Sequence, residues 1–256
     1  VAVFTNIHIT HFHGFLGITD IAVATSYIVT LILMIIIINA VNLIDGIDGL
    51  AASVGIVASL AFGIFFFLSG DYGYTVMTAA LLGALIGFLR YNISTGPKKI
   101  FMGDSGSLVI GFTMAVFAIH FNELVANGNP VTRLESAPSI AIAILIIPLY
   151  DTLRVTVLRL RAGKSIFVGD KRHIHHMMLR AGFSHRQATR YISLFNVVMI
   201  ALAFLLDGLG ILLLGLLLLA ICLLATWMLS MYVKKIVPAE TKMVQAPEMA
   251  EVTSLN

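Results

Sequence analysis

The chain has 256 residues, of which 59% are hydrophobic and only 11% are charged, with a formal net charge of +3. Its mean hydropathy is +0.99. Soluble domains carry roughly 25% charged residues, so this composition cannot be buried in one soluble globule. The apolar residues form long runs, which predicts an all-α, polytopic membrane protein and excludes a disordered chain or a coiled coil. The single cysteine excludes a disulfide framework.

Runs of about 17–25 apolar residues indicate transmembrane helices, and about seven such runs occur in this chain. They cover roughly 21–41, 50–69, 73–89, 106–121, 138–157, 191–207 and 209–233. Only Asp207 and Gly208 separate the last two runs, so this hairpin is the weakest assignment. We expect residues 1–237 to form one transmembrane domain, and we expect the polar tail, 238–256, to be disordered in the cytoplasm.

The basic residues predict the orientation of the helices, because cytoplasmic loops are enriched in Lys and Arg. When the gaps between the runs are numbered alternately, 15 of the 16 basic residues fall on one side and only Arg133 falls on the other. The loops 42–49, 90–105 and 158–190 are therefore predicted to face the cytoplasm, with the start of the chain outside. Attraction to anionic membrane lipid explains the surplus of positive charge, so no nucleic acid is expected as a partner.

The first cytoplasmic loop carries two acids where carboxylates are usually functional. In the segment NAVNLIDGIDGLA, Asn39 and Asn42 are followed by Asp45 and Asp48. Polar residues recur at every third position, which keeps them on one broad side of a helical turn. Gly46 lies beside the acids and would let a ligand approach the backbone closely. The alternative is a helix cap at Asp48, which would explain one acid but not the other polar residues.

The second cytoplasmic loop reads FMGDSGSL, starting at Phe101, immediately before an apolar run. Asp104 has two explanations: it caps the following helix, or it lies beside helix-terminal N–H groups where a metal and phosphates are both favoured. Mg²⁺ takes one or two carboxylates and completes its shell with water and phosphate oxygens. Asp104 is therefore a candidate Mg²⁺ ligand, although the short string alone is a weak signal.

The third cytoplasmic loop contains Arg159 and the string HIHH, with His173, His175 and His176. A zinc site would need a fourth ligand of suitable spacing, and no cysteine lies near. A solvated basic loop is a second alternative. We favour Arg and protonated His donors that gather to hold a diphosphate.

Together, the strings NAVNLIDGIDGLA, FMGDSGSL and HIHH resemble the polyprenyl-phosphate N-acetylhexosamine-1-phosphate transferases. The HIHH form is similar to the branch that uses UDP-N-acetylglucosamine. This resemblance implies an enzyme of the bacterial inner membrane that transfers N-acetylhexosamine-1-phosphate from a UDP-N-acetylhexosamine to undecaprenyl phosphate and releases UMP. The reaction would be the first membrane step of cell-envelope polysaccharide synthesis, with the active site facing the cytoplasm.

The resemblance also implies roles for individual residues. Asp104 would bind Mg²⁺, which Mn²⁺ is able to replace, and Phe101 would contact the uracil ring. Asp45 and Asp48 would belong to the catalytic loop. The other residues carried over are catalytic histidines and substrate-binding residues, namely His173, His175, His176, Asn39, Asn42, Asn92 and Arg159.

One departure from the family concerns a pair of consecutive Asp residues on an earlier cytoplasmic loop, which this sequence lacks. We expect that pair to precede Val1 in a longer protein. A truncated, inactive remnant is therefore one alternative, and a secondary transporter with acids near the middle of the bilayer is another. A kink at Pro148 would shape an apolar groove for the polyprenyl chain. The sequence leaves open whether the chain forms a homodimer.

Overall fold

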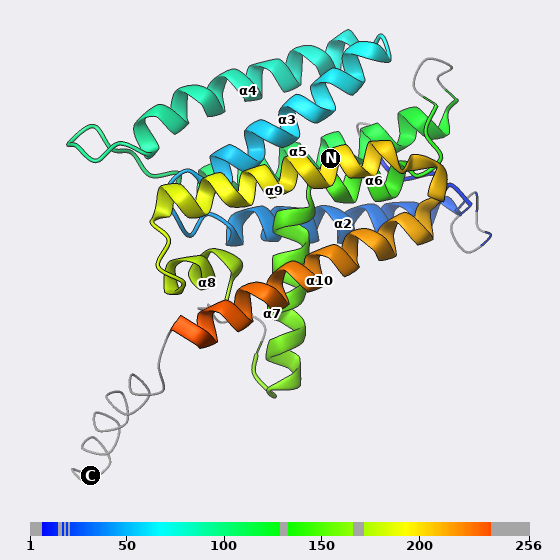
Figure 1. Ribbon diagram of the computed structural model, residues 1–256. Helices are drawn as coiled ribbons and strands as arrows, with labels where there is room; N and C mark the ends of the chain where they lie inside the picture. Colours follow the sequence, from blue (N-terminus) through cyan, green and yellow to red (C-terminus); the bar gives the residue numbers. More distant parts are fainter. Residues whose placement is uncertain are drawn as a thin grey trace, which may run out of the picture.

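The structure, a computed structural model, describes residues 7–14, 17, 19, 21–128, 133–165 and 172–236. These residues form nine α-helices and one short 3₁₀ helix, and no strand lies among them (Figure 1). The prediction of an all-α membrane protein is confirmed, while the tail predicted at 238–256 lies outside the described residues. The elements are α2 (Val23–Leu43), α3 (Leu50–Leu68), α4 (Tyr72–Asn92), α5 (Gly103–Ala126), α6 (Ala137–Ile144), α7 (Ile146–Arg161), α8 (Ile174–Arg180), α9 (His185–Leu205), η2 (Asp207–Leu209) and α10 (Ile211–Ile236).

Six of these helices, α2, α3, α4, α5, α9 and α10, are long and apolar enough to cross a membrane. They match six of the predicted runs, with shifted ends. The largest shift is at α9, which begins at His185 because Ser184 and Gln187 form a capping box that starts the helix early. The remaining run, 138–157, is not one straight helix: α6 and α7 meet there at an angle of 83°.

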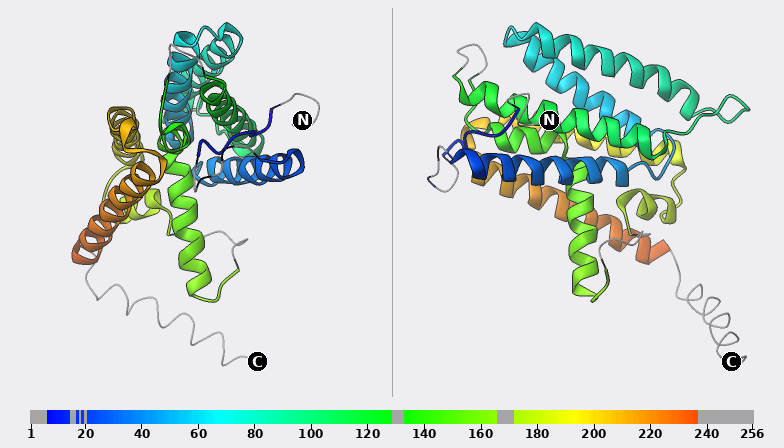
Figure 2. Two further views of the ribbon diagram at one scale, coloured as in Figure 1. Left: turned by 90° about the vertical axis from the view of Figure 1, so that its right-hand side faces the viewer. Right: turned by 180° about the vertical axis from the view of Figure 1, so that it is seen from behind.

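The most extensive helix packing is of α3 on α4 and of α2 on α5, with α4 at the outer edge of the bundle (Figure 2). A methyl group at Gly111 of α5 would lie 2.8 Å from the Cα of Ile38, so this glycine lets the two backbones approach closely. Between α3 and α5, the rings of Phe62 and Phe121 pack edge to face with 5.7 Å between their centroids. Small residues and aromatic rings therefore fix the spacing of these helices.

The outer helices expose apolar side chains, as a lipid environment requires. On α10, Leu212, Leu216 and Leu223 are each more than half exposed, and Trp227 is exposed to 60%. A helix with apolar side chains on all sides, most of them not covered by the rest of the protein, is stable when lipid surrounds it. This pattern agrees with a multi-pass membrane protein.

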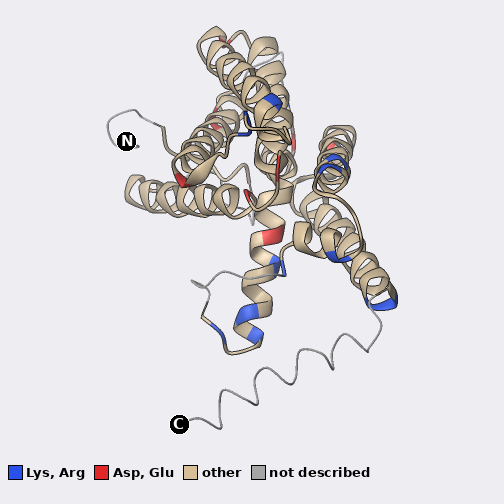
Figure 3. Cartoon of the chain, turned by 90° about the vertical axis from the view of Figure 1, so that its left-hand side faces the viewer, with Lys and Arg blue, Asp and Glu red and all other residues tan. Residues whose placement is uncertain are grey.

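All three predicted motif loops lie at one end of the bundle, on the left in Figure 1. Residues 44–49 join α2 to α3, residues 93–102 lead into α5, and α8 leads into α9. We call this end the motif end. Figure 3 views the molecule from it and shows the Lys and Arg residues near the ends of α9 and α10 and along α7. Arg133 instead precedes α6 at the opposite end, and the membrane side that each end faces stays a prediction.

The opposite end contains its own polar contacts. Asp71 caps α4 by accepting a hydrogen bond from the backbone N–H of Tyr74, and its carboxylate lies 2.7 Å from Nε2 of His120 on α5. Asp207 in η2 accepts hydrogen bonds from the backbone N–H groups of Glu135 and Ser136, which tie the last helical hairpin to the start of α6. The hairpin predicted at Asp207 is thus present and anchored.

The bend between α6 and α7 has an identifiable cause. Pro148 has no N–H group to donate to the carbonyl of Ile144, and its ring would collide with that carbonyl in a straight helix. The chain therefore breaks at Leu145, and the amide of Asn196 on α9 donates to the freed carbonyls of Ile144, at 3.2 Å, and Ala143, at 3.5 Å. The predicted kink is confirmed, and Asn196, which is fully buried, satisfies the backbone that it exposes.

We expect Asn196→Leu to lower the stability of the protein by about 1–2 kcal/mol, because two buried carbonyls lose a donor. The measurement is thermal unfolding in detergent, followed by circular dichroism. Asn122→Leu is the matched control, since the Asn122 amide donates only to the Ala118 carbonyl of its own helix. Equal melting temperatures for the Asn196 variant and the unmodified protein would show that Asn196 does not stabilise the bend.

Candidate active site

The acidic loop between α2 and α3 places Asp45 and Asp48 at the motif end, each partly buried. The hydroxyl of Thr189 on α9 donates to the backbone carbonyl of Asp48 at 2.9 Å, which ties the loop to that helix. The capping explanation for Asp48 is wrong. Gly49, with a φ of +79°, occupies the cap position of α3, and no side chain caps that helix.

The start of α5 lies against the end of α2 through one asparagine. Nδ2 of Asn42 donates to Oγ of Ser107 at 2.7 Å and lies 3.4 Å from Oδ1 of Asp104. Asp104 is exposed in the first turn of α5, and it does not cap the helix, whose cap position is Met102. The capping explanation is therefore wrong for this acid also, and two of the predicted loops meet at Asn42.

The three acids share one electrostatic environment. The pKa of Asp45 is raised to about 6, first by burial and then by the negative charges of Asp104 and Asp48. Neighbouring carboxylates oppose one another's ionisation, because each negative charge makes the next one less favourable. The structure therefore brings together the carboxylates that the first two motifs predict.

Asp48 is neutralised by a residue outside the predicted set. Nζ of Lys99 donates to Oδ2 of Asp48 at 2.7 Å, and Nδ1 of His185 lies 3.6 Å from the same oxygen. The Lys99 ammonium also lies 5.1 Å from the ring centroid of Phe101, within cation–π range. Phe101 is 75% exposed, so its ring remains open to a planar ligand.

Three of the predicted substrate-binding residues have contacts within the protein. The amide of Asn92 accepts from the backbone N–H of Gly49 at 2.6 Å and donates to the carbonyl of Ile100 at 2.9 Å, which connects two motif loops. Asn39 donates to the Ile35 carbonyl of its own helix. Nε of Arg159 donates to the carbonyl of Ser165 at 2.6 Å, beyond the end of α7. Their roles toward a substrate stay predictions.

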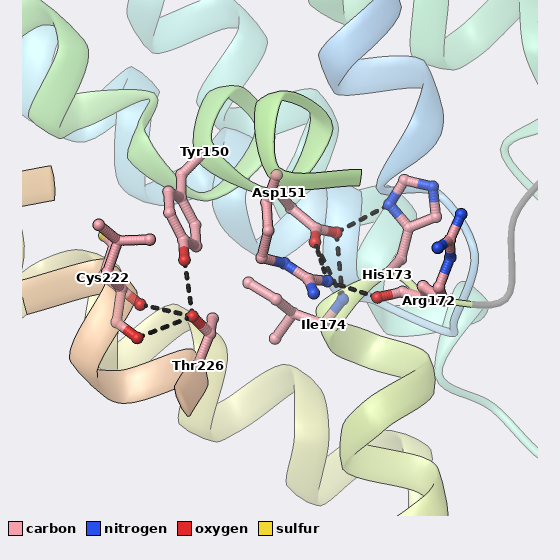
Figure 4. Close-up of polar contacts among 9 residues, drawn as sticks. Tyr150, Asp151, Arg172, His173, Ile174, Cys222 and Thr226 are labelled. Atoms are coloured by element: carbon pink, nitrogen blue, oxygen red, sulfur yellow. Dashed lines mark hydrogen bonds and ion pairs between the residues drawn. The ribbon is translucent and has the colours of Figure 1, made fainter. Parts of the chain in front are cut away.

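The HIHH segment is not a solvated loop. His173 and His175 are 6% and 2% exposed, so this alternative is wrong for both residues. Their rings are parallel, with 5.7 Å between centroids, and the ring of His176 follows at 4.3 Å from His175. Nδ1 of His173 lies 2.9 Å from Oδ2 of Asp151 on α7 (Figure 4). The segment is thus a packed row of imidazoles.

His175 joins this row to the acidic loop. A methyl group at Gly46 would lie 2.3 Å from Nε2 of His175, so the imidazole fills the space above this glycine. The side of Gly46 where a Cβ would lie is therefore not open to a ligand, and a ligand that approaches another side of this exposed glycine stays a prediction. Neither ring nitrogen has a hydrogen-bond partner among the residues that the structure describes. Burial, followed by the nearby His176, lowers the pKa of His175 to about 4, so the ring is neutral near pH 7. It therefore has an unused donor and acceptor beside the acids.

An apolar groove lies beside the HIHH segment, between α7, α9 and α10. The bend at Pro148 turns α7 away from the bundle, and the hydroxyl of Tyr150 then meets Oγ1 of Thr226 on α10 at 2.6 Å (Figure 4). The groove is lined mainly by apolar side chains, among them Ile146, Ile147, Tyr150, Met178, Phe195 and Leu229. Ile174, at the start of α8, also lines the groove.

Comparison with known proteins supports the resemblance. Residues 1–122 match Glycosyl transferase family 4. The chain is 37% identical over 193 residues to a decaprenyl-phosphate N-acetylglucosaminephosphotransferase of Mycobacterium tuberculosis, an alignment that covers 71% of this chain and 47% of the relative. The undecaprenyl-phosphate alpha-N-acetylglucosaminyl 1-phosphate transferase of Yersinia pestis is 34% identical, in an alignment that covers 66% of this chain and 45% of the relative. The enzyme of the same name from Escherichia coli K12 is 30% identical, in an alignment that covers 62% of this chain and 42% of the relative. These matches confirm the resemblance to the polyprenyl-phosphate N-acetylglucosamine-phosphate transferases.

The chain spans about half the length of the curated relatives it matches. The family match includes the first two motifs, at 39–51 and 101–108, whereas HIHH lies beyond residue 122. The grouping of HIHH with the acids therefore rests on the fold, through the contact between His175 and Gly46.

Sequence reasoning assigned no role in the site to three residues that the structure places there. Lys99 neutralises Asp48, Asp151 contacts His173, and Asn196 supports the bend that turns Asp151 toward the histidines. A signal existed for two of them: Asp151 and Asn196 are polar residues inside or beside apolar runs, where they are rare. Nothing in the sequence indicates that Lys99 pairs with Asp48.

We expect Gly46→Ala to displace His175 and to lower stability by about 1–3 kcal/mol, as overpacking of a close contact does. Thermal unfolding in detergent measures the loss. Gly96→Ala is the matched control in the loop before α5, because a methyl group there has no atom within 4 Å. If both variants melt at the same temperature, the His175 ring does not fill the space above Gly46.

We expect Asp45→Asn to stabilise the protein at pH 8 when no divalent cation is added. The folded-state pKa is raised from 3.8 to about 6, so ionisation costs stability as the pH rises through this window. The gain in melting temperature should be full well above pH 6, should shrink as the pH falls below 6, and should vanish only below pH 3.8, where the carboxyl is protonated in both the folded and the unfolded state. Melting curves between pH 3 and pH 8 measure it, and a gain independent of pH would contradict the raised pKa of Asp45.

Proposed function

We propose that this protein transfers N-acetylglucosamine-1-phosphate from UDP-N-acetylglucosamine to a polyprenyl phosphate and releases UMP. The observation that supports this most strongly is the meeting of Asp45, Asp48, Asp104 and His175 at one end of a membrane bundle. The names of the aligned relatives specify a polyprenyl phosphate and N-acetylglucosamine phosphate. The acids and imidazoles would bind the phosphate groups of both substrates, and the apolar groove beside them would bind the polyprenyl chain.

The acidic cluster fits a divalent metal. The like-charge effect on Asp45 is relieved when a cation is bound between the carboxylates, and exposed Asp104 is available as a ligand. Within the described residues, no group of three or more His, Cys, Asp or Glu residues is arranged to hold a metal. Mg²⁺ needs only one or two protein carboxylates, so we propose Asp104 as its ligand, with Asn42 beside it. When bound, Mg²⁺ or Mn²⁺ neutralises diphosphate charge.

The reaction would make one bond and break one bond. An oxygen of the lipid phosphate attacks the β-phosphorus of the nucleotide sugar, and the bond from that phosphorus to the oxygen of the UMP phosphate breaks. The lipid phosphate has a pKa of about 6 for its second proton and is largely ionised at pH 7, so a strong base is not required. His173 and His175 supply N–H donors to the diphosphate, and Asp45 or Asp48 orients the lipid phosphate.

The donor and the acceptor would approach from different sides. Exposed Phe101, with Lys99 against its ring, offers a stacking surface for the uracil ring. The apolar groove beside α7 and α10 offers a surface for the polyprenyl chain, with its phosphate toward the histidines. We propose that the motif end faces the cytoplasm of a bacterial inner membrane, in agreement with the distribution of basic residues.

The alternatives explain the structure less well. A transporter would place acids along the middle of its helices, whereas Asp45 and Asp48 lie in a loop and Asp104 lies in the first turn of α5. An inactive remnant does not explain why His175 is buried against the acidic loop without a hydrogen-bond partner among the described residues. The sequence upstream of Val1 in the native gene distinguishes this remnant from an enzyme with the missing acidic pair.

We expect Asp104→Asn in the full-length protein to reduce Mg²⁺-dependent UMP release by at least about 10²-fold, because the proposed metal ligand loses its charge. The assay follows UMP with UDP-N-acetylglucosamine and undecaprenyl phosphate. A second measurement is the rise in melting temperature on addition of Mg²⁺, which Asp104→Asn should abolish. Glu135→Gln, at the opposite end, should change neither quantity. Near-normal turnover by the Asp104 variant would refute the metal assignment.

A further inference from the structure

The carboxylate of Asp151 is the most completely buried charge at the motif end. Its side chain is 2% exposed, on the first turns of α7. A buried carboxylate is tolerated only where donors surround it. It is not one of the three acids of the motif loops, and the reaction proposed above assigns it no part.

Three donors satisfy the two oxygens of Asp151 (Figure 4). Oδ1 accepts from Nη2 of Arg154 at 2.9 Å and from the backbone N–H of Ile174 at 3.1 Å. Oδ2 lies 2.9 Å from Nδ1 of His173. Arg154 also donates to the backbone carbonyl of Arg172, so the Asp151–Arg154 pair holds the residues on both sides of His173.

The contact at Nδ1 decides which nitrogen of His173 is available to a ligand. A carboxylate accepts hydrogen bonds, so Nδ1 carries the proton, and Nε2 lies on the opposite side of the ring. The ring of His173 is parallel to that of His175, which packs on Gly46 of the acidic loop. The contact with Asp151 therefore sets the orientation of the His173 ring, which stacks parallel to the His175 ring beside the acidic loop.

We propose that Asp151 is a positioning residue, which holds His173 in one tautomer and one orientation with Nε2 directed to the diphosphate of the nucleotide sugar. This inference rests on the proposed function. The same arrangement, in which a buried carboxylate orients a histidine that contacts the reacting group, occurs in hydrolases and at metal sites, where its loss lowers activity. The bend at Pro148, which Asn196 supports, brings Asp151 to the histidine.

The experiment is a double-mutant cycle on the full-length protein, with UMP release as the readout. Asp151→Asn keeps the size of the side chain and an acceptor for Ile174, but it removes the charge that selects the tautomer. We expect Asp151→Asn and His173→Ala each to lower kcat by about 10–100-fold. The double variant should lose no more than His173→Ala alone, because Asp151 acts through His173.

Asp71→Asn is the matched control, because Asp71 also pairs with a histidine, His120, at the opposite end of the bundle. It should leave kcat within about twofold of the unmodified protein, as is usual for sites remote from the chemistry. Multiplied losses in the double variant, or near-normal kcat for Asp151→Asn, would overturn the positioning role.

A readout without activity separates this inference from the proposed function. In protein labelled with ¹⁵N-histidine, NMR reports which nitrogen carries the proton, and the His173 signal is assigned by its loss in His173→Ala. We expect the proton on Nδ1 in the unmodified protein and a mixture of tautomers in Asp151→Asn. A proton on Nε2 in the unmodified protein overturns the inference, even if Asp151→Asn fails to fold. Absence of UMP release by the unmodified protein would instead refute the proposed function.

Discussion

The arrangement of the motif end depends on the burial of one negative charge. The carboxylate of Asp151 is shielded from water, and a charge in that position is stable only while it receives several hydrogen bonds. Those bonds come from Arg154, the backbone of Ile174 and the ring of His173, so α8 cannot move away from α7 without exposing or unpairing the charge. The short helix that carries the histidines is therefore fixed by electrostatics more than by its own seven residues.

The acidic side of the site has the opposite character. Helix packing holds Asp45 near Asp104 and Asp48, and its burial, together with the repulsion from these two acids, makes ionisation of Asp45 unfavourable. Only Asp48 has a close cationic partner among the described residues, Lys99 at 2.7 Å. The bundle thus supplies the rigidity that keeps like charges together, and the proposed metal and diphosphate substrates have complementary charges. The same end of the fold contains one fully satisfied carboxylate and one group of carboxylates that favours a cation.

The sequence was sufficient to predict the helices and the three motif loops, because a lipid environment requires long apolar runs whose backbone is satisfied internally. It predicted a kink near Pro148 but not its angle, which depends on Asn196 from a helix later in the chain. It also failed to pair Asp151 with His173. The residues are separated by a bend and a loop, and only the direction of α7 brings them together. Local spacing describes one turn of a helix, whereas these contacts depend on packing between elements.

The contact of Gly46 with His175 has a consequence for how such chains vary. The two residues belong to segments far apart in sequence, yet one imidazole occupies the volume that a side chain at the other position would need. A larger residue in the acidic loop must either displace this ring or be accompanied by a smaller residue opposite. In homologous chains, a side chain larger than glycine at the first position is therefore expected together with a smaller one at the second.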